Sequence, residues 1–236
     1  MNDTVETYEH AGLTVRIEYD EDYASYENGL DWSRVGTMWI RWNRYTLGDM
    51  QDDPDTACEE CGGNYYTDDN GDEIVCPVCK GSIAEDPVGW IKRQHGARVV
   101  LPLSIYEHSG ITIRVGSGAF PMDSQGWDSG SAGFIFDTPE GVEQCLGADA
   151  TDEQIKAAMR QEVELYDDVL TGNVYGFVIA SETDDHLDSC WGFVGSDLSY
   201  IKAEANDAAE YQAELIAKEA QEVAHWHARD VMTTDD

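Results

Sequence analysis

A segment near the start of the chain recurs in its middle. Residues 8–17, YEHAGLTVRI, align without a gap with residues 106–115, YEHSGITIRV. In both copies apolar and polar residues alternate after the glycine, which is the two-residue period of a strand that buries one face. The similarity continues, after a slip of one residue, over the following loop and strand. We therefore expect two related strand–loop–strand units, over residues 8–42 and 106–138.

Further elements follow the second copy. A capping box at residues 151–154, TDEQ, opens a helix that ends near Gly172. Strands are expected at 174–180 and 189–194, and a long alanine-rich helix over residues 200–230. The apolar face of the first helix comprises Ile155, Met159, Val163, Tyr166 and Leu170. The inner face of the long helix is expected to comprise Ile201, Ala205, Ala208, Leu215, Ile216, Val223 and Trp226.

These elements predict an α+β fold. Its centre is a mostly antiparallel sheet built from the two related units and a third hairpin, with helices covering its apolar face. By its character the chain divides into a first repeat unit, a zinc-ribbon insertion, a second repeat unit and an acidic helix–hairpin–helix region, at residues 1–56, 57–86, 87–148 and 149–236. All of these ranges except the ribbon are expected to share one core.

Two CxxC pairs lie between the repeats, Cys58 with Cys61 and Cys76 with Cys79. Each pair places two thiolates on one tight turn, and four thiolates complete a tetrahedral site that is closed to substrate. We therefore expect one structural Zn²⁺ with these four ligands. Two disulfides are the alternative, which a reducing cytosol disfavours. The remaining cysteines, Cys145 and Cys190, are expected to be buried thiols.

The chain carries 48 acidic and 14 basic residues, a formal net charge of −34 at pH 7. This charge repels phosphate backbones and attracts basic protein surfaces, so no direct binding of nucleic acid is expected. Two explanations stay open. Either the acids form a face that occupies a cationic groove, as in a DNA mimic, or they are an adaptation to high salt, where screening weakens their mutual repulsion.

The acids are distributed unevenly along the chain. Residues 149–236 hold 21 acids and five bases, whereas residues 87–148 hold six acids and four bases. Acids on the long helix, and in the loop of the hairpin before it, are therefore the candidates for binding a host protein with a cationic groove. These candidates are Glu182, Asp184, Asp185, Glu204, Asp207, Glu210 and Glu214. The oligomeric state is left open.

A catalytic interpretation would gather a base, an orienting carboxylate and a nucleophile into one site. Its candidate residues are His108, Asp128, His186, Asp188 and Cys190. Each has an adequate role in a turn or hairpin, and the sequence contains no phosphate loop, nucleophile elbow or HExxH motif. We expect a protein that is not an enzyme.

No apolar run approaches the roughly 20 residues of a membrane span, and no signal peptide is visible, so a cytoplasmic location is expected.

The chain resembles a widespread family of uncharacterised proteins encoded by phages, prophages and related viruses. The segments that carry the resemblance are VGTM (35–38), NRYTLGD (43–49), LPL (101–103), YEHSGI (106–111), WDSG (127–130), GFI (133–135), LTG (170–172), VYGF (174–177) and DSCWGF (188–193). The CxxC pairs are an addition to the usual pattern of that family.

The resemblance implies a viral protein acting in the cytoplasm of a host cell. It favours counter-defence by DNA mimicry, in which the protein blocks a nucleic-acid-directed host enzyme of the restriction or CRISPR type. The alternative is a viral accessory protein with another partner, whose acidity reflects a salty host. A hydrolase with a His/Asp/Cys site is a lesser alternative.

Overall fold

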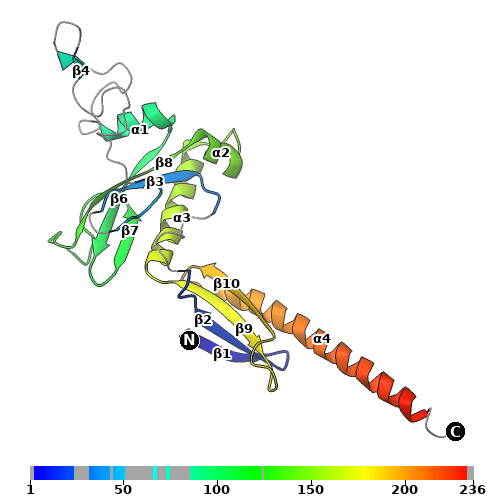
Figure 1. The fold of residues 1–236 in the computed structure, drawn as a ribbon. Coiled ribbons are helices and arrows are strands. Elements are labelled where there is room, and N and C mark those ends of the chain that lie inside the picture. The colour runs from blue at the N-terminus through cyan, green and yellow to red at the C-terminus, as the bar shows by residue number, and fades with distance from the viewer. Residues whose placement is uncertain are drawn as a thin grey trace. The chain divides into compact units, whose positions relative to one another are not determined.

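The structure is a computed structural model that describes residues 3–23, 32–42, 45–50, 66–67, 73–74, 86–123 and 125–232, with side chains left undescribed at 66–67, 73–74 and 227–232. Figure 1 shows the chain as a ribbon. Contacts divide it into two compact units. Unit 1 joins Met1–Ala24 to Gly172–Asp236, and unit 2 is Ser25–Thr171. Each unit has a four-stranded antiparallel sheet and its own helices, so the α+β class is confirmed.

Unit 1 is a sheet with one long helix. Its elements are β1 (Thr4–His10), β2 (Leu13–Tyr19), β9 (Val174–Ala180), β10 (Asp188–Val194) and α4 (Ser199–Met232). The strand order is β1-β2-β9-β10. A two-residue turn joins β1 to β2, and Ala11 and Gly12 both have positive φ, at 50° and 78°. Positive φ at both positions matches the right-handed twist of the two strands.

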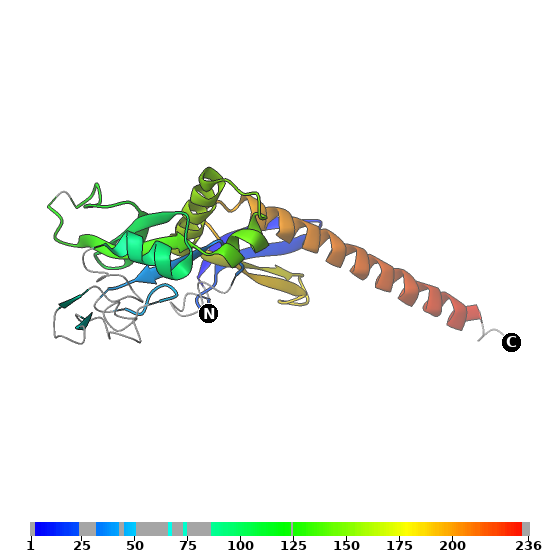
Figure 2. The same ribbon diagram turned by 90° about the horizontal axis from the view of Figure 1, so that it is seen from above.

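The first turns of α4 hold it against the sheet of unit 1. Ile201, Ala205 and Ala209 are buried against apolar side chains of β2 and β9, among them Ile17 and Phe177. Alanine at two of these positions allows the helix backbone to lie close to the strands. Beyond this contact α4 extends past the ends of the strands, as Figures 1 and 2 both show.

Unit 2 contains a second sheet with the order β3-β8-β6-β7 and a separate two-stranded pair, β4-β5. Its elements are β3 (Gly36–Ile40), β4 (Tyr66–Thr67), β5 (Glu73–Ile74), α1 (Pro87–His95), β6 (Val100–Glu107), β7 (Ile111–Val115), β8 (Ser129–Asp137), α2 (Pro139–Cys145) and α3 (Asp152–Leu170).

Both faces of this second sheet are packed. On one face the buried stripe of α3 contacts the inward side chains of the strands, including Met38 and Ile135. Successive strand residues point to opposite faces, so Trp39 and Phe136 lie on the other face. There they pack with Trp90 of α1. The capping box, the extent of α3 and all five residues of its predicted apolar face are confirmed.

The predicted single sheet is wrong, because the first repeat is divided between the two sheets. Its hairpin, β1-β2, belongs to unit 1, whereas its returning strand, β3, pairs with β8 in unit 2. In the second repeat the returning strand β8 stays beside its own hairpin and pairs with β6. In unit 1 the strand added to the hairpin is β9, which is buried at every residue and pairs with β2 rather than with β1, the counterpart of β6.

The two hairpins also differ in register. Tyr8 lies opposite Val15 and packs against the core of unit 1. Its counterpart Tyr106 lies opposite Thr112, on the face away from α3, with its ring 5.7 Å from that of Phe120. A shift of one residue turns every side chain of a strand to the other face. The two copies therefore form hairpins whose second strands begin with the same burial pattern, and they differ in the turn and in the pairing register.

Two smaller expectations are also corrected. Leu215, Ile216, Val223 and Trp226, which the apolar spacing places on the inner face of the long helix, are exposed, because the sheet ends before the helix does. Cys145 and Cys190 are exposed rather than buried thiols. The division of the chain at 1–56, 57–86, 87–148 and 149–236 stays a prediction from the sequence. Contacts in the structure group the chain into the two units given above.

Candidate functional site

Two hairpin loops and the middle of α4 meet at one end of unit 1. Thr14 pairs with Ala180, which brings the β1–β2 turn beside the β9–β10 loop. Gln212 of α4 donates from Nε2 to Asp188 Oδ2 at 3.1 Å, at the start of β10. His10 and Glu210 lie 2.9 Å apart, between Nε2 and Oε1. The loops and α4 are thus tied together by side-chain contacts.

We call this region the acidic end of unit 1. Its exposed acids are Glu9, Glu182, Asp184, Asp185, Glu210 and Glu214. Within the β9–β10 loop, Ser181 Oγ accepts from the backbone N–H groups of Thr183 and Asp184, and Asp184 Oδ1 accepts from the N–H of His186. These bonds fix the loop backbone that carries the acids. The structure therefore brings together the two groups of acids that the sequence singled out separately.

The remaining predicted acids, Glu204 and Asp207, lie nearer the start of α4. Asp207, Glu210 and Glu214 are exposed and follow each other at spacings of three and four residues, along the side of α4 opposite its buried stripe. At about 1.5 Å per residue, this spacing is roughly 4.5 to 6 Å along the axis. One strand of duplex DNA presents a phosphate about every 3.4 Å of its axis. The row of three acids is therefore less dense than the phosphates of one DNA strand. Glu204 lies on the flank of this row.

The two units also differ in charge density. Unit 1 holds 21 acids and four bases in 89 residues, and unit 2 holds 27 acids and ten bases in 147 residues. Both units therefore carry a net charge of −17, but unit 1 carries it on far fewer residues. Electrostatic attraction to a basic partner depends on local charge density, so unit 1 is the stronger candidate for contact.

The catalytic candidates are divided between the units. His108 Nδ1 and Asp128 Oδ2 lie 3.0 Å apart in unit 2, and both side chains are exposed. The other three belong to unit 1. There His186 Nε2 lies 3.1 Å from Ser189 Oγ, Asp188 is bound by Gln212, and Cys190 is exposed on β10. Four of the five residues thus make local contacts at turns and strand ends.

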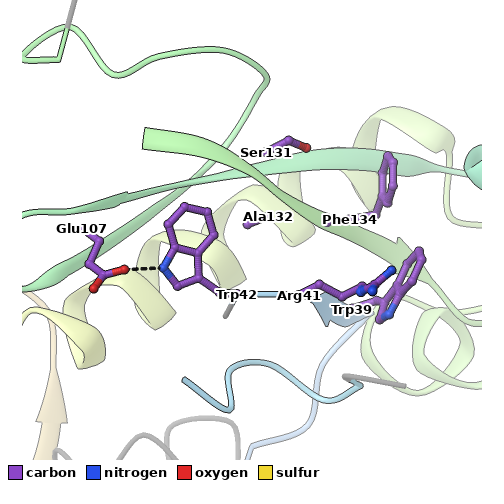
Figure 3. Close-up of a pocket in the computed structure, with 8 residues that line it drawn as sticks. Trp39, Arg41, Trp42, Glu107, Ser131, Ala132 and Phe134 are labelled. Carbon is purple, nitrogen blue, oxygen red and sulfur yellow. Dashed lines mark hydrogen bonds between the residues drawn. The ribbon is translucent and has the colours of Figure 1, made fainter. Parts of the chain in front are cut away.

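Unit 2 contains a pocket of about 610 Å³ that the sequence did not reveal. Figure 3 shows its lining, which comprises Trp39, Arg41, Trp42, Glu107, Ser131, Ala132, Gly133 and Phe134. The indole N–H of Trp42 donates to Glu107 Oε2 at 2.6 Å and so fixes the ring at one side of the pocket. The segment WIRW, residues 39–42, was its only sequence signal. Aromatic rings beside one cation and one anion can hold a small planar group.

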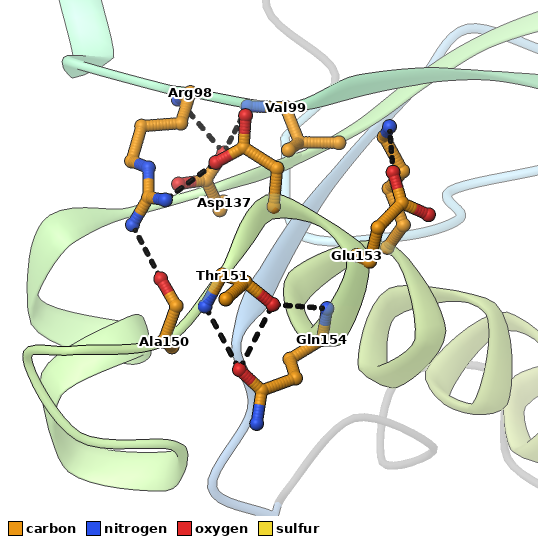
Figure 4. Close-up of polar contacts among 9 residues, drawn as sticks. Arg98, Val99, Asp137, Ala150, Thr151, Glu153 and Gln154 are labelled. Atoms are coloured by element: carbon orange, nitrogen blue, oxygen red, sulfur yellow. Dashed lines mark hydrogen bonds and ion pairs between the residues drawn. The ribbon is translucent and has the colours of Figure 1, made fainter.

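Several carboxylates of unit 2 are buried and act as acceptors for backbone N–H groups. Asp137, 1% exposed, accepts from the N–H groups of Arg98 and Val99 at 2.9 and 2.6 Å. Arg98 also donates to Ala150 O and pairs with Asp152, which joins the start of β6 to the start of α3 (Figure 4). These contacts hold the sheet and α3 together beside the capping box.

Glu162 plays the same part at the start of β3. It accepts from the N–H groups of Val35 and Gly36 at 2.6 and 2.9 Å. Burial raises the pKa of the Glu162 carboxyl, and the two N–H donors oppose that rise.

Asp123 organises a loop by accepting from Trp127 N, Asp128 N and Ser129 Oγ. The hydrogen bond from Ser129 is the main cause that lowers the pKa of Asp123.

The chain matches no family model, no curated protein and no solved structure.

The predicted zinc ligands Cys58, Cys61, Cys76 and Cys79 lie outside the described residues. Strands β4 and β5 pair between the two CxxC motifs, with Tyr66 opposite Ile74. Among the residues that the structure describes, no group of three or more His, Cys, Asp or Glu is arranged to hold a metal. No helix in the described ranges has the length and apolar character needed to cross a membrane.

Proposed function

We propose that this chain is a viral or phage-encoded acidic binding protein that blocks a nucleic-acid-directed host enzyme by presenting carboxylates in place of DNA phosphates. The proposal includes a location in the host cytoplasm and one structural zinc in the segment with the CxxC pairs. The partner is a host protein of the restriction or CRISPR type with a cationic groove. The zinc serves the fold, since four thiolate ligands leave no open coordination position.

The observation that supports this proposal is the convergence of acids at one end of unit 1. Glu182, Asp184 and Asp185 of the β9–β10 loop lie at the same end as Glu210 and Glu214 of α4. Contacts within unit 1 tie down both the loop and the helix, so the carboxylates are held in place before a partner arrives. Preorganised charge of one sign speeds encounter with a basic groove and limits the entropy lost on binding.

The test is inhibition of purified DNA-directed enzymes, a restriction endonuclease and a CRISPR effector, at 0.1 M salt. We expect inhibition that duplex DNA relieves by competition. The variant with Glu204, Asp207, Glu210 and Glu214 all changed to Lys should lose inhibition at least tenfold, because it reverses the charge of the helix. Circular dichroism should show the same helix content as the parent.

The matched control reverses four exposed acids of unit 2. In this variant Glu140, Glu143, Asp149 and Glu164 are changed to Lys, so the net charge changes by the same amount as in the test variant. It should inhibit within about twofold of the parent. Equal loss in both variants would attribute inhibition to net charge alone, and a parent that inhibits neither enzyme would contradict the mimicry.

A high-salt adaptation is the second candidate, and one observation favours it. Unit 2, which does not contain the acidic end, also carries a net charge of −17. If the acids serve only as a hydrated layer, the fold should weaken markedly between 2 M and 0.1 M KCl as their repulsion is unscreened. Thermal unfolding in both salts distinguishes the two, because a mimic has to be folded at 0.1 M.

A further inference from the structure

The second half of α4 presents large aliphatic side chains to solvent. Every residue from 214 to 226 is exposed. Leu215, Ile216 and Val223 are 37%, 41% and 55% exposed. The part of α4 that carries them extends beyond the sheet that packs on the first turns of the helix, as the ribbons in Figures 1 and 2 show.

The exposed aliphatic residues continue the face that unit 1 buries. Ala209, Ile216 and Val223 follow each other at intervals of seven residues, and so do Ala208 and Leu215. Seven residues are almost two helical turns, so these side chains lie along one side of the helix. Ala209 is buried and Ala208 packs against the same core. The apolar face therefore continues where the sheet stops, with larger side chains, and Glu219 lies on the same face, four residues after Leu215 and four before Val223.

The surroundings of this stripe are acidic. Glu219 lies on the stripe and Glu222 beside it, both exposed, and Lys218 is the one Lys or Arg in residues 214–226. A second copy of the chain would set these acids, and a second unit of net charge −17, against the first. A partner surface with Lys and Arg beside an apolar strip complements the stripe in both respects. Two helices can pack along a straight stripe of this kind.

We propose that residues 214–226 of α4 form a docking helix for a basic amphipathic helix of a partner protein, with Leu215, Ile216 and Val223 at the centre of the contact. The inference deepens the proposed function, on which its choice of partner rests, by adding an apolar contact to the acidic one. Carboxylates alone would give attraction with little selectivity, whereas a buried apolar strip beside them fixes where along α4 the partner binds.

The probe is a synthetic helix of Leu and Lys in which the leucines form one stripe, labelled for fluorescence anisotropy. A scrambled peptide of the same composition has no stripe and serves as the first control. We expect the parent protein to bind the striped peptide at least tenfold more tightly than the scrambled one at 0.15 M salt. Hydrogen exchange in residues 214–226 should slow on binding of the striped peptide.

The decisive variant carries Leu215→Ser, Ile216→Ser and Val223→Ser, which should weaken binding of the striped peptide at least tenfold. The matched control carries Val88→Ser, Leu146→Ser and Leu165→Ser, three similarly exposed aliphatic residues of unit 2. It should bind within twofold of the parent. Equal binding by both variants, or by both peptides, would overturn the docking helix and leave only charge attraction.

Two further measurements complete the test. Sedimentation of the parent should show a monomer, because a dimer that the serine variant disperses would assign the stripe to a second copy and overturn the proposal. Peptide binding by the parent protein is also compared with its inhibition in the enzyme assay described above. A parent that inhibits but does not bind the striped peptide would remove the docking helix and keep the mimicry. A parent that binds the striped peptide but inhibits neither enzyme would keep the docking helix and remove the mimicry.

Discussion

The two units carry equal net charge and use their carboxylates differently. Among the described residues the four buried polar side chains, Ser104, Asp123, Asp137 and Glu162, all belong to unit 2. Three of them are acids that accept hydrogen bonds from backbone N–H groups. In unit 1 the acids of the β9–β10 loop, and those of α4 up to residue 226, are exposed. The buried acids thus belong to unit 2, whereas unit 1 acids that accept from backbone N–H groups, such as Asp20 and Asp184, are not buried.

The difference follows from how each sheet begins. In unit 2, the N–H groups of Val35 and Gly36 at the start of β3, and of Arg98 and Val99 before β6, have no strand partner and take a carboxylate instead. A buried N–H without an acceptor costs about 1–3 kcal/mol. Acids in these places are therefore part of the core and do not contribute to the surface that would meet a partner.

The largest expected effect concerns the segment of unit 2 with the CxxC pairs. We expect about one zinc per chain, because a structural Zn²⁺ contributes roughly 10–16 kcal/mol of binding free energy in small zinc domains. Cys58→Ser or Cys76→Ser should abolish zinc binding, as measured by elemental analysis. Cys145→Ser, at an exposed cysteine of the same unit, should keep the zinc. A parent protein with less than half a zinc per chain would contradict the site.

The next effect distinguishes a core acid from a surface acid. Asp137→Ala should lower the free energy of unfolding by about 3 kcal/mol, because it leaves the N–H groups of Arg98 and Val99 without their acceptor. Urea unfolding measures this loss. Asp137→Asn keeps one acceptor oxygen and should cost less. A loss below about 1 kcal/mol for the alanine variant would remove the distinction between the units.

A smaller effect is a dependence on pH that arises in unit 2. Burial raises the pKa of Asp167 from 3.8 to about 6, although the N–H of Ile113, which donates to it at 2.7 Å, opposes the rise. Between these values the folded state keeps a proton that the unfolded state has lost. The contribution of Asp167 to the free energy of unfolding should therefore be greatest below about pH 4. This contribution should be lost as the pH rises from about 4 to 6.

The variant Asp167→Asn should remove this part of the slope. The full shift would correspond to roughly 3 kcal/mol, and partial exposure of Asp167 reduces our expectation to about 1 kcal/mol. Unfolding at pH 4.5 and pH 7 in both proteins measures the difference. An unchanged slope in the variant would mean that another group causes it.

The smallest effect is expected at the surface of unit 1. Asp207→Ala and Glu214→Ala should each change the free energy of unfolding by less than about 0.5 kcal/mol, because exposed acids contribute little to stability. The same variants should weaken binding to a basic partner measurably. A loss of stability above 1.5 kcal/mol would show that these acids support the fold, and the contrast between the units would then fail.

Part of the fold could be predicted from the sequence because its signals are local. The capping box and the spacing of apolar residues define α3, and the hairpin of β9 and β10 was expected at 174–180 and 189–194, within one residue of its ends. The long helix was expected at 200–230 and forms at Ser199–Met232. Helix caps, turns and periodicity act over a few residues, so a single segment contains the information needed to recognise them.

Other features depend on contacts between distant segments and were decided only by the tertiary structure. β2 pairs with β9, more than 150 residues away, and β3 pairs with β8, which divides the first repeat between two sheets. Glu162 stands among other helix acids in the sequence, and only the start of β3 makes it a buried acceptor. Ala209, Ile216 and Val223 share one spacing, yet the sheet covers only the first. Period alone assigns a residue to a face, and the length of the neighbouring sheet determines how much of that face is buried.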